Sequence, residues 1–251
     1  MTRRLLGRKF LSLFGGEGHL ATALAEQGVE SLLFDVAHSK RNNIASKRVA
    51  STIDGCLLLF DIHGFDLPCS TWSRARRAPK ESSFPSPMRS NLHPMGLPDL
   101  SAKDHCTALL HNKLHRSVIK WSTKSLIAGK SGYIENPIGS ILWNTRGIRR
   151  LERLGARFLV VDMCQYGRQC KKATKLLVWG PAFDDVEFLR CSGHKGICSR
   201  TRKKHVVLSG VQHGQFRSSA AQVYSLEFGR SMALQLYKNA AARHKNPTRG
   251  A

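Results

Sequence analysis

Short apolar runs alternate along the chain with segments of helical pattern. Residues 10–14 form an apolar run with the length and composition of a buried parallel strand. The apolar side chains that follow recur at helical spacing, at Leu20, Ala21, Leu24 and Ala25. Gly28 stands where a helix is expected to end, and residues 29–36 form a second apolar run. The pattern therefore predicts a strand, a loop, a helix and a second strand.

The same alternation continues through the rest of the chain. Further strands are predicted at residues 56–62, 132–137, 156–162 and 175–179. Helices are predicted at residues 40–51, 103–124, 143–154 and 220–243. The helix at 103–124 is expected to bury a face made of Leu109, Leu110, Leu114, Val118 and Trp121. Strands that alternate with helices predict an α/β fold, and we expect a Rossmann-like, doubly wound, mostly parallel sheet.

Three kinds of segment depart from this pattern. Residues 1–9 are expected to form a basic N-terminal arm and residues 244–251 a basic tail, on either side of one domain at 10–243. Residues 79–98 contain five prolines among serines, which predicts a mobile loop over one face of the sheet. Residues 180–215, before the last helix, predict a small irregular insert rich in Lys, Arg, Cys and His.

The chain is strongly basic. It contains 40 Lys and Arg against 17 Asp and Glu, for a net charge of +23 and a pI near 10.4. Such an excess favours a polyanionic partner, and we expect DNA, held mainly through its backbone, or RNA. A solvated basic surface with no partner stays open as an alternative. No apolar run approaches the roughly 18 residues of a membrane span, so we expect no membrane partner.

The seven cysteines are odd in number and lack the framework of a small secreted protein. This usage predicts reduced thiols in an intracellular protein. Together with the basic charge it leads us to expect a nuclear monomer.

The loop after the first predicted strand has the composition of a cofactor site. Gly15, Gly16 and Gly18 let the backbone turn sharply and approach a ligand, next to Phe14 and Glu17. A helix that starts after such a loop offers unpaired N–H groups. Asp35, at the end of the second strand, can accept hydrogen bonds from both ribose hydroxyls. The spacing differs from G-x-G-x-x-G and favours S-adenosylmethionine, although a glycine turn also serves merely to pack a helix on a sheet.

Two residue pairs that follow later strands carry further chemistry, because ligands bind beyond the carboxyl ends of strands in such sheets. The pairs are Pro68-Cys69 and Glu135-Asn136. In this order, downstream of the glycine loop, they resemble the cytosine-5 DNA methyltransferases. A closer resemblance is to methylase-like segments of protist and algal mobile-element proteins. It runs from about Phe14 to Ala233 and is strongest at residues 68–76, 96–100, 135–143 and 166–176.

The resemblance implies a covalent mechanism on cytosine. Cys69 would attack carbon 6 while Glu135 holds the opposite edge of the ring, and Asn136 would position Glu135. Carbon 5 would then take the methyl group of S-adenosylmethionine. A base inside a duplex cannot reach such a site, so base flipping is implied. The mechanism needs no metal.

Two groups of basic residues are expected to contact phosphates: Arg74, Arg76 and Arg77 after Cys69, and Lys171, Lys172 and Lys175 in a later loop. The arginines are also expected to keep Cys69 ionised, because nearby cations lower the pKa of a thiol.

Several alternatives remain open at this point. Asn136-Pro137 also fits the motif of amino-methyltransferases. The spacing of Cys191, His194, Cys198 and His205 permits a zinc site, although the family pattern implies none there. Gln169-Cys170 replaces the usual Pro-Trp, and the insert at 180–215 is too short for a sequence-recognition domain. These departures allow a relic that binds nucleic acid without catalysis.

Overall fold

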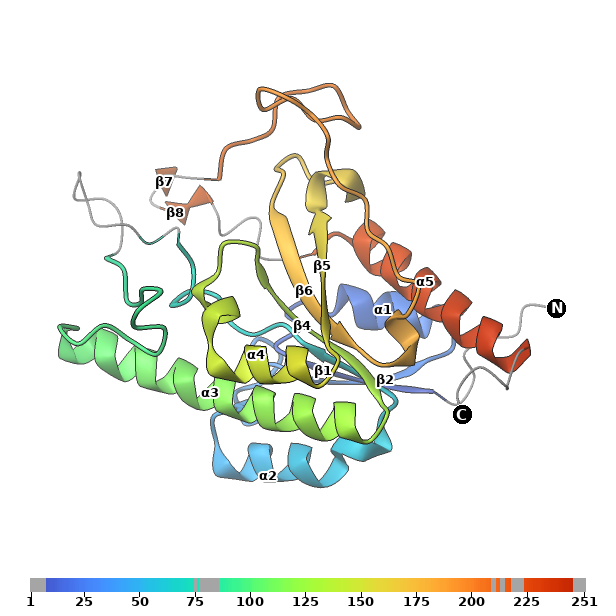
Figure 1. Cartoon of the computed structure of the whole chain (residues 1–251), viewed down its shortest axis with the longest axis horizontal. Helices are drawn as coiled ribbons and strands as arrows, with labels where there is room; N and C mark the ends of the chain where they lie inside the picture. Colours follow the sequence, from blue (N-terminus) through green and yellow to red (C-terminus); the bar gives the residue numbers. More distant parts are fainter. Residues whose placement is uncertain are drawn as a thin grey trace.

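The structure, a computed structural model, describes residues 8–74, 76, 86–208, 211–212, 215–217 and 224–245. A six-stranded sheet with strand order β2-β1-β3-β4-β6-β5 forms its centre (Figure 1). The strands are β1 (Lys9–Leu13), β2 (Glu30–Phe34), β3 (Ile62–Phe65), β4 (Ser131–Pro137), β5 (Arg157–Asp162) and β6 (Ala173–Trp179). The helices are α1 (His19–Ala25), α2 (Lys47–Cys56), α3 (Ala102–Ile127), α4 (Arg146–Arg153) and α5 (Leu226–Lys245).

Two helical layers cover the two faces of the sheet. Helices α1 and α5 pack together on one face, and α2, α3 and α4 cover the other (Figure 1). Alternating residues of β1 separate the two cores, since Phe10 faces α1 and α5 while Leu11 and Leu13 face the other layer. The architecture is therefore a doubly wound α/β sandwich, as predicted.

One strand of the sheet runs against the others. Strands β1, β2, β3 and β4 pair in parallel, whereas β6 lies antiparallel between β4 and β5. The mostly parallel, Rossmann-like sheet predicted from the sequence is confirmed. Because β1, β3 and β4 are adjacent and parallel, the loops after them meet at one edge of the sheet, where ligands bind in folds of this kind.

The strand predicted at residues 56–62 is wrong. Cys56 is the last residue of α2, and a 3₁₀ turn occupies Leu57–Leu59. Leu58 and Leu59 are 49% and 69% exposed, so this apolar run does not build the core. The strand instead starts at Ile62. Because it contains His63 and Gly64, it is not a continuous apolar run, so the apolar pattern did not predict it.

Helix α3 also buries a narrower face than predicted. Leu114, Val118 and Trp121 lie in the core, whereas Leu109 and Leu110 are exposed. The helix begins at a capped end, because the Asp104 backbone N–H donates to the Ser101 hydroxyl. The exposed leucines lie in its N-terminal half.

The segments at the chain ends and in the loops are only partly described. The basic arm and the tail fall largely outside the described residues, as do Arg77 and residues 79–85 of the proline-rich loop. Residues 86–98 of that loop are described: they have no regular structure, as predicted, but Met88 and Arg89 are buried, so this part is packed into the domain instead of being mobile. The insert at 180–215 contains a 3₁₀ turn at Pro181–Phe183 and otherwise little regular structure until β7 (Val211–Gln212) pairs with β8 (Gln215–Phe216). No helix among the described residues has the length and apolar character needed to cross a bilayer.

Candidate active site

The glycine loop between β1 and α1 adopts the sharp turn that its composition predicts. The backbone has positive φ at Phe14 (63°), Gly16 (54°) and Gly18 (72°), and the Gly18 N–H donates to the Gly15 carbonyl at 3.0 Å. A Cβ added at Gly18 would lie 2.7 Å from Leu33, so only glycine lets α1 start this close to β2. A Cβ at Gly16 would meet nothing within 4 Å and would point into open space.

Asp35 joins this loop to the end of β2. Its two carboxylate oxygens accept backbone N–H groups, from Gly16 at 3.0 Å and from Ala37 at 2.8 Å. Since an ionised carboxylate has about four acceptor positions, the half-buried group can still accept from a ligand. Glu17 points to solvent and pairs with the His19 ring at 3.3 Å.

Cys69 lies in the loop after β3, on a fixed turn. Its carbonyl accepts the N–H groups of Trp72 (3.0 Å) and Ser73 (2.9 Å), and the Trp72 side chain is fully buried. Burial raises the pKa of the Cys69 thiol, the charge of Glu135 raises it further, and Lys172 lowers it. The expectation that neighbouring arginines keep this thiol ionised is therefore not met, because the cation that acts on it is Lys172.

Glu135 lies at the end of β4, beside the Cys69 loop. The side chain is 8% exposed, and burial raises its pKa, although Lys172 and the Tyr224 hydroxyl act in the opposite direction. Its Oε1 atom is buried and has no hydrogen-bond partner among the described residues. A buried carboxyl oxygen without a protein partner keeps its hydrogen-bonding capacity for a bound group.

Asn136 holds β4 to the segment that leads to Cys69. Its Nδ2 atom donates to the carbonyl oxygens of Leu67 (2.8 Å) and Glu135 (2.9 Å). Strands β3 and β4 are parallel, with Phe65 opposite Ile134, so the residues after each strand lie at the same edge. The structure thus brings Cys69, Glu135 and Asn136 together from two neighbouring strand ends.

Three residues of this site were missed by the sequence analysis. Asp66 follows β3 directly and accepts hydrogen bonds from the hydroxyls of Tyr133 (3.2 Å) and Tyr224 (2.9 Å). Burial and the charge of Glu135 raise the pKa of Asp66 to about 8, against the two tyrosine hydrogen bonds. A lone Asp between Phe and Leu gives no signal in the sequence, and Tyr224 comes from the other end of the chain.

The predicted phosphate-binding arginines lie in the loop around Cys69. Arg74 donates to the Asn91 side chain at 2.9 Å, and Arg76 donates to the carbonyls of Ser70 (3.0 Å) and Ser86 (2.8 Å). These contacts connect the segment after Cys69 to residues 86–91. Phosphate binding by Arg74 and Arg76 stays a prediction.

The three predicted lysines separate into different environments. Lys171 donates to the Cys191 carbonyl at 3.4 Å. Lys172 lies over the Tyr224 ring at 5.3 Å and belongs to the Cys69 site. Lys175 lies over the Phe158 ring at 3.5 Å, and burial lowers its pKa. The spacing in the sequence suggested one basic surface. Lys171 and Lys172 instead lie in the loop before β6, where the backbone turns through a positive φ at Lys172 (30°), and only Lys175 lies on the strand.

A buried arginine supports the turn that carries Cys69. Arg89 is 3% exposed and lies over the Trp72 ring at 3.5 Å. It donates to Thr71 (3.2 Å) and to the Asn112 side chain (2.7 Å). Burial lowers its pKa to about 10. The sequence did not predict this buried position, because an arginine in a proline-rich segment is expected to be exposed.

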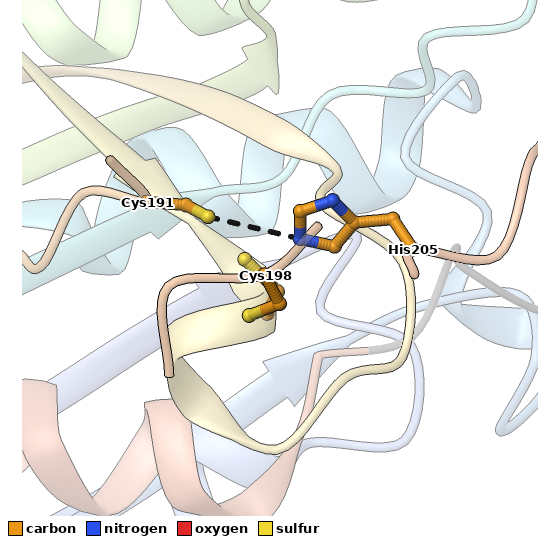
Figure 2. Close-up of side chains that lie close together, drawn as sticks. Cys191, Cys198 and His205 are labelled. Atoms are coloured by element: carbon orange, nitrogen blue, oxygen red, sulfur yellow. Dashed lines mark hydrogen bonds between the residues drawn. The ribbon is translucent and has the colours of Figure 1, made fainter. Parts of the chain in front are cut away.

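The cysteines and histidines of the insert also gather, but not in the predicted set. His194 is exposed, whereas Cys191 and Cys198 are buried near His205 (Figure 2). The fourth member of the cluster is Cys164, from the 3₁₀ turn Met163–Tyr166 that follows β5.

The chain is similar to known proteins only among solved structures. No family model matches the chain, and no curated protein does. The S. pombe Dnmt2 methyltransferase is similar over 72% of this chain and 52% of its own, with 8% identity and a TM-score of 0.40. A DNMT2 mutant from Spodoptera frugiperda is similar over 80% and 57%, with 16% identity and a TM-score of 0.38. The chain thus spans little more than half the length of these proteins.

The topology and the loop positions define the class of the domain. A doubly wound sheet with one antiparallel strand next to its edge, and a glycine loop between β1 and α1, is a methyltransferase-like Rossmann fold. The candidate site occupies the edge of the sheet at which this class binds its ligands.

Proposed function

We propose that this chain is an S-adenosylmethionine-dependent methyltransferase that methylates carbon 5 of cytosine in DNA. The observation that carries the proposal is the placement of Cys69 and Glu135 at the ends of two adjacent parallel strands, with a buried Glu135 oxygen that lacks a partner. A thiol on one side and a carboxyl group on the other are the two groups that activation of a cytosine ring requires.

The state of Glu135 suits its proposed role. Because burial raises its pKa, the carboxyl group is favoured in the protonated form and can donate a hydrogen bond to the ring nitrogen of cytosine. This interaction withdraws electrons from carbon 6, where the Cys69 sulfur would form a bond. Carbon 5 would then take the methyl group as the sulfonium–methyl bond breaks and leaves a thioether. A base, which water can supply, would remove the carbon-5 proton, and the carbon–sulfur bond would break to return Cys69 as a thiolate.

The two groups also influence each other. The negative charge of Glu135 raises the pKa of Cys69, so protonation of Glu135 removes this effect and favours the thiolate. Lys172 favours the thiolate as well. The mechanism requires a protonated Glu135 and a Cys69 thiolate, the latter formed when the thiol proton passes to water.

The glycine loop and Asp35 fit the cofactor, which supplies the methyl group when bound. Gly16 faces open space, and the Asp35 carboxylate keeps acceptor capacity next to it. These residues would hold the adenosine and amino-acid parts, at the edge of the sheet that also carries Cys69.

Covalent trapping tests this function. In a duplex that contains 5-fluorocytosine, loss of the carbon-5 substituent is blocked, so the bond to Cys69 persists. With cofactor present we expect a complex that survives denaturation, is absent for Cys69→Ser, and forms normally with Cys106→Ser, which removes an exposed thiol. Trapping on RNA but not on DNA would show that RNA is the substrate, and the proposed mechanism would stand. Absence of trapping on both, with folded and cofactor-bound protein, would overturn the proposal.

A non-catalytic relic of the same fold is the second candidate, favoured by the raised pKa of Cys69. It predicts no heat in a calorimetric titration with S-adenosylmethionine. The amino-methyltransferase alternative is disfavoured, because the Asn136 amide is fully buried and already donates to two carbonyls.

A further inference from the structure

Four ligand-forming side chains meet at one point outside the candidate active site. The sulfur atoms of Cys164, Cys191 and Cys198 and a ring nitrogen of His205 all lie within 4.8 Å of one another. All three cysteines are buried and carry free thiols. Figure 2 shows Cys191, Cys198 and His205 converging, with the Cys191 sulfur 3.7 Å from the His205 Nε2 atom.

These positions are close to those of a tetrahedral metal site. With Zn–S near 2.3 Å and Zn–N near 2.0 Å, ligand atoms on a tetrahedron are separated by about 3.5 Å (sulfur to nitrogen) to 3.8 Å (sulfur to sulfur). The Cys191–His205 separation of 3.7 Å falls in this range, and the limit of 4.8 Å requires shifts of about 1 Å at most for the longest pair. Three thiolates and one imidazole are a donor set that zinc prefers.

The surroundings of the sulfur atoms suit thiolates bound to a metal. The Ser199 backbone N–H (3.4 Å) and hydroxyl (3.6 Å) contact the Cys191 sulfur. The Gln165 amide donates to the sulfurs of Cys164 (3.5 Å) and Cys198 (3.7 Å). Such outer hydrogen bonds orient the ligands of structural metal sites.

Asp162 aligns two of the ligands. This fully buried residue ends β5 two positions before Cys164, and its Oδ2 atom accepts the Cys191 backbone N–H at 2.8 Å. Arg190 donates to the same oxygen at 2.9 Å. The carboxylate thus holds Cys191 against the end of β5, two residues before Cys164.

Residues 187–208, the part of the insert that carries Cys191, Cys198 and His205, have few other packed side chains, although Phe188 lies half-buried against Phe228. In residues 187–208, all of which the structure describes, the only buried side chains are those of Cys191 and Cys198. The apolar side chains Leu189, Ile197 and Val207 are exposed, and the only β pairing is the isolated bridge between Ile197 and Lys204. A segment without its own apolar core usually needs a cross-link or a metal to be ordered.

We propose that Cys164, Cys191, Cys198 and His205 bind one structural Zn²⁺ ion that fastens the insert to the end of β5. Four protein ligands close the coordination sphere, which is the arrangement of structural rather than catalytic zinc. A surface hollow of about 440 Å³, bordered by Cys198, His194 and Arg202, lies beside the cluster. The sequence predicted no metal here and left open a zinc site made of Cys191, His194, Cys198 and His205. The proposed site differs from that alternative in one ligand, since Cys164 takes the place of His194.

Metal analysis of the purified full-length chain tests the site directly. We expect about one zinc ion per chain, a value reduced at least several-fold by Cys198→Ser and by His205→Ala. Two matched controls should keep their zinc: Cys170→Ser, which removes a buried thiol outside the cluster, and His194→Ala. Equal loss in His194→Ala and His205→Ala would overturn the assignment, as would metal-free wild-type protein that stays folded and reduced in the presence of zinc.

Cobalt substitution and proteolysis provide readouts that do not depend on how well a variant folds. Wild-type protein stripped of metal and titrated with Co²⁺ should develop the visible absorption of tetrahedral thiolate coordination. Removal of the metal should expose the insert to trypsin at Lys195, Arg200 and Lys203, while the sheet domain stays intact. A cleavage rate that zinc does not change, or octahedral cobalt without thiolate bands, would contradict the proposal. A disulfide between two of these cysteines in protein purified with zinc and without added oxidant would also contradict it.

Discussion

The Tyr224 hydroxyl donates a hydrogen bond of 2.9 Å to the Asp66 carboxylate. This bond joins the residue just before the last helix to the end of β3. The Tyr133 hydroxyl donates to the other Asp66 oxygen, and the Tyr224 carbonyl lies 2.6 Å from a ring nitrogen of His19 in α1. The three contacts place the start of α5 against the glycine loop and the Cys69 loop, so Asp66 links the candidate cofactor site to the candidate catalytic pair.

Asp66→Asn should change how stability depends on pH. The pKa of Asp66 is raised from 3.8 to about 8 in the folded protein, mainly by burial, so its stabilising contribution is complete below 3.8 and is lost as pH rises toward 8. In wild-type protein we expect the free energy of unfolding to fall by up to about 1.4 kcal/mol per pH unit over this range. The asparagine variant should show a flatter profile in urea unfolding.

The pH window of that experiment matters because buried histidines act in the opposite direction. Burial lowers the pKa of His111 and His115 from 6.5 to about 4, so they add stability as pH rises to 6.5. Above 6.5 their effect is complete. Both proteins share all the other ionisable groups, so the difference between their profiles from pH 6.5 to 8 reports on Asp66. Parallel profiles for Asp66→Asn and wild type in this window would show that Asp66 ionises normally.

Asn136→Ala should destabilise the protein and slow covalent trapping. It removes two buried hydrogen bonds, to Leu67 and Glu135, and leaves their carbonyls unpaired, at a cost of about 1–3 kcal/mol. Asn144→Ala is a matched control, since its amide donates at an exposed position to Asn91. We expect a change within about 0.5 kcal/mol there. Equal losses of stability in the two variants would remove the special role of Asn136.

Gly16→Ala should separate cofactor binding from backbone strain. Gly16 (φ 54°) and Gly129 (φ 67°) both have positive φ, and a Cβ at either meets nothing within 4 Å. Alanine at each should therefore cost a similar amount, about 1 kcal/mol. Only Gly16→Ala should weaken S-adenosylmethionine binding in calorimetry, because the added methyl group projects into the space beside Asp35. Unchanged affinity would place the cofactor elsewhere.

The sequence predicted best those elements whose conformation follows from their own residue pattern. The run at 10–14, the glycines after it and the spacing of Leu20 and Leu24 led to a strand, loop and helix close to those observed at Lys9–Leu13 and His19–Ala25. The apolar run at 156–162 likewise became β5. In these segments the local pattern and the tertiary contacts favour the same conformation.

Elements whose burial depends on distant partners could not be predicted. His63 is fully buried in β3 because its ring contacts the carbonyls of Leu57 and Ser131 and the Ser125 hydroxyl. The residues around His63 in the sequence do not indicate those partners. The same holds for Cys164, which joins the insert cysteines only because β5 ends beside them, and for Tyr224, whose partner is Asp66.

Arg89→Lys should destabilise the turn that carries Cys69. The guanidinium donates to Thr71, Asn112 and two carbonyls while lying on Trp72, and an ammonium cannot reproduce this fork. Unpaired acceptors in the interior make a loss of about 2–3 kcal/mol the expectation in thermal or urea unfolding. Arg74→Lys, at an exposed position with one bond to Asn91, should change stability by less than about 0.5 kcal/mol. Equal, small effects would mean that the buried network is unimportant.

Lys172→Gln should make Cys69 less reactive at neutral pH. Lys172 lowers the pKa of Cys69 against burial and Glu135, so its removal raises that pKa and moves the pH dependence of alkylation upward. The rate of modification at Cys69, followed by peptide mass spectrometry across pH, measures this shift. Lys171→Gln is the control, because that ammonium donates to the Cys191 carbonyl. Lys172 also lowers the pKa of Glu135, so its removal makes Glu135 easier to protonate. Covalent trapping should still become slower, because less of Cys69 is in the thiolate form. Identical alkylation profiles for wild type and both variants would show that Lys172 does not control the thiol.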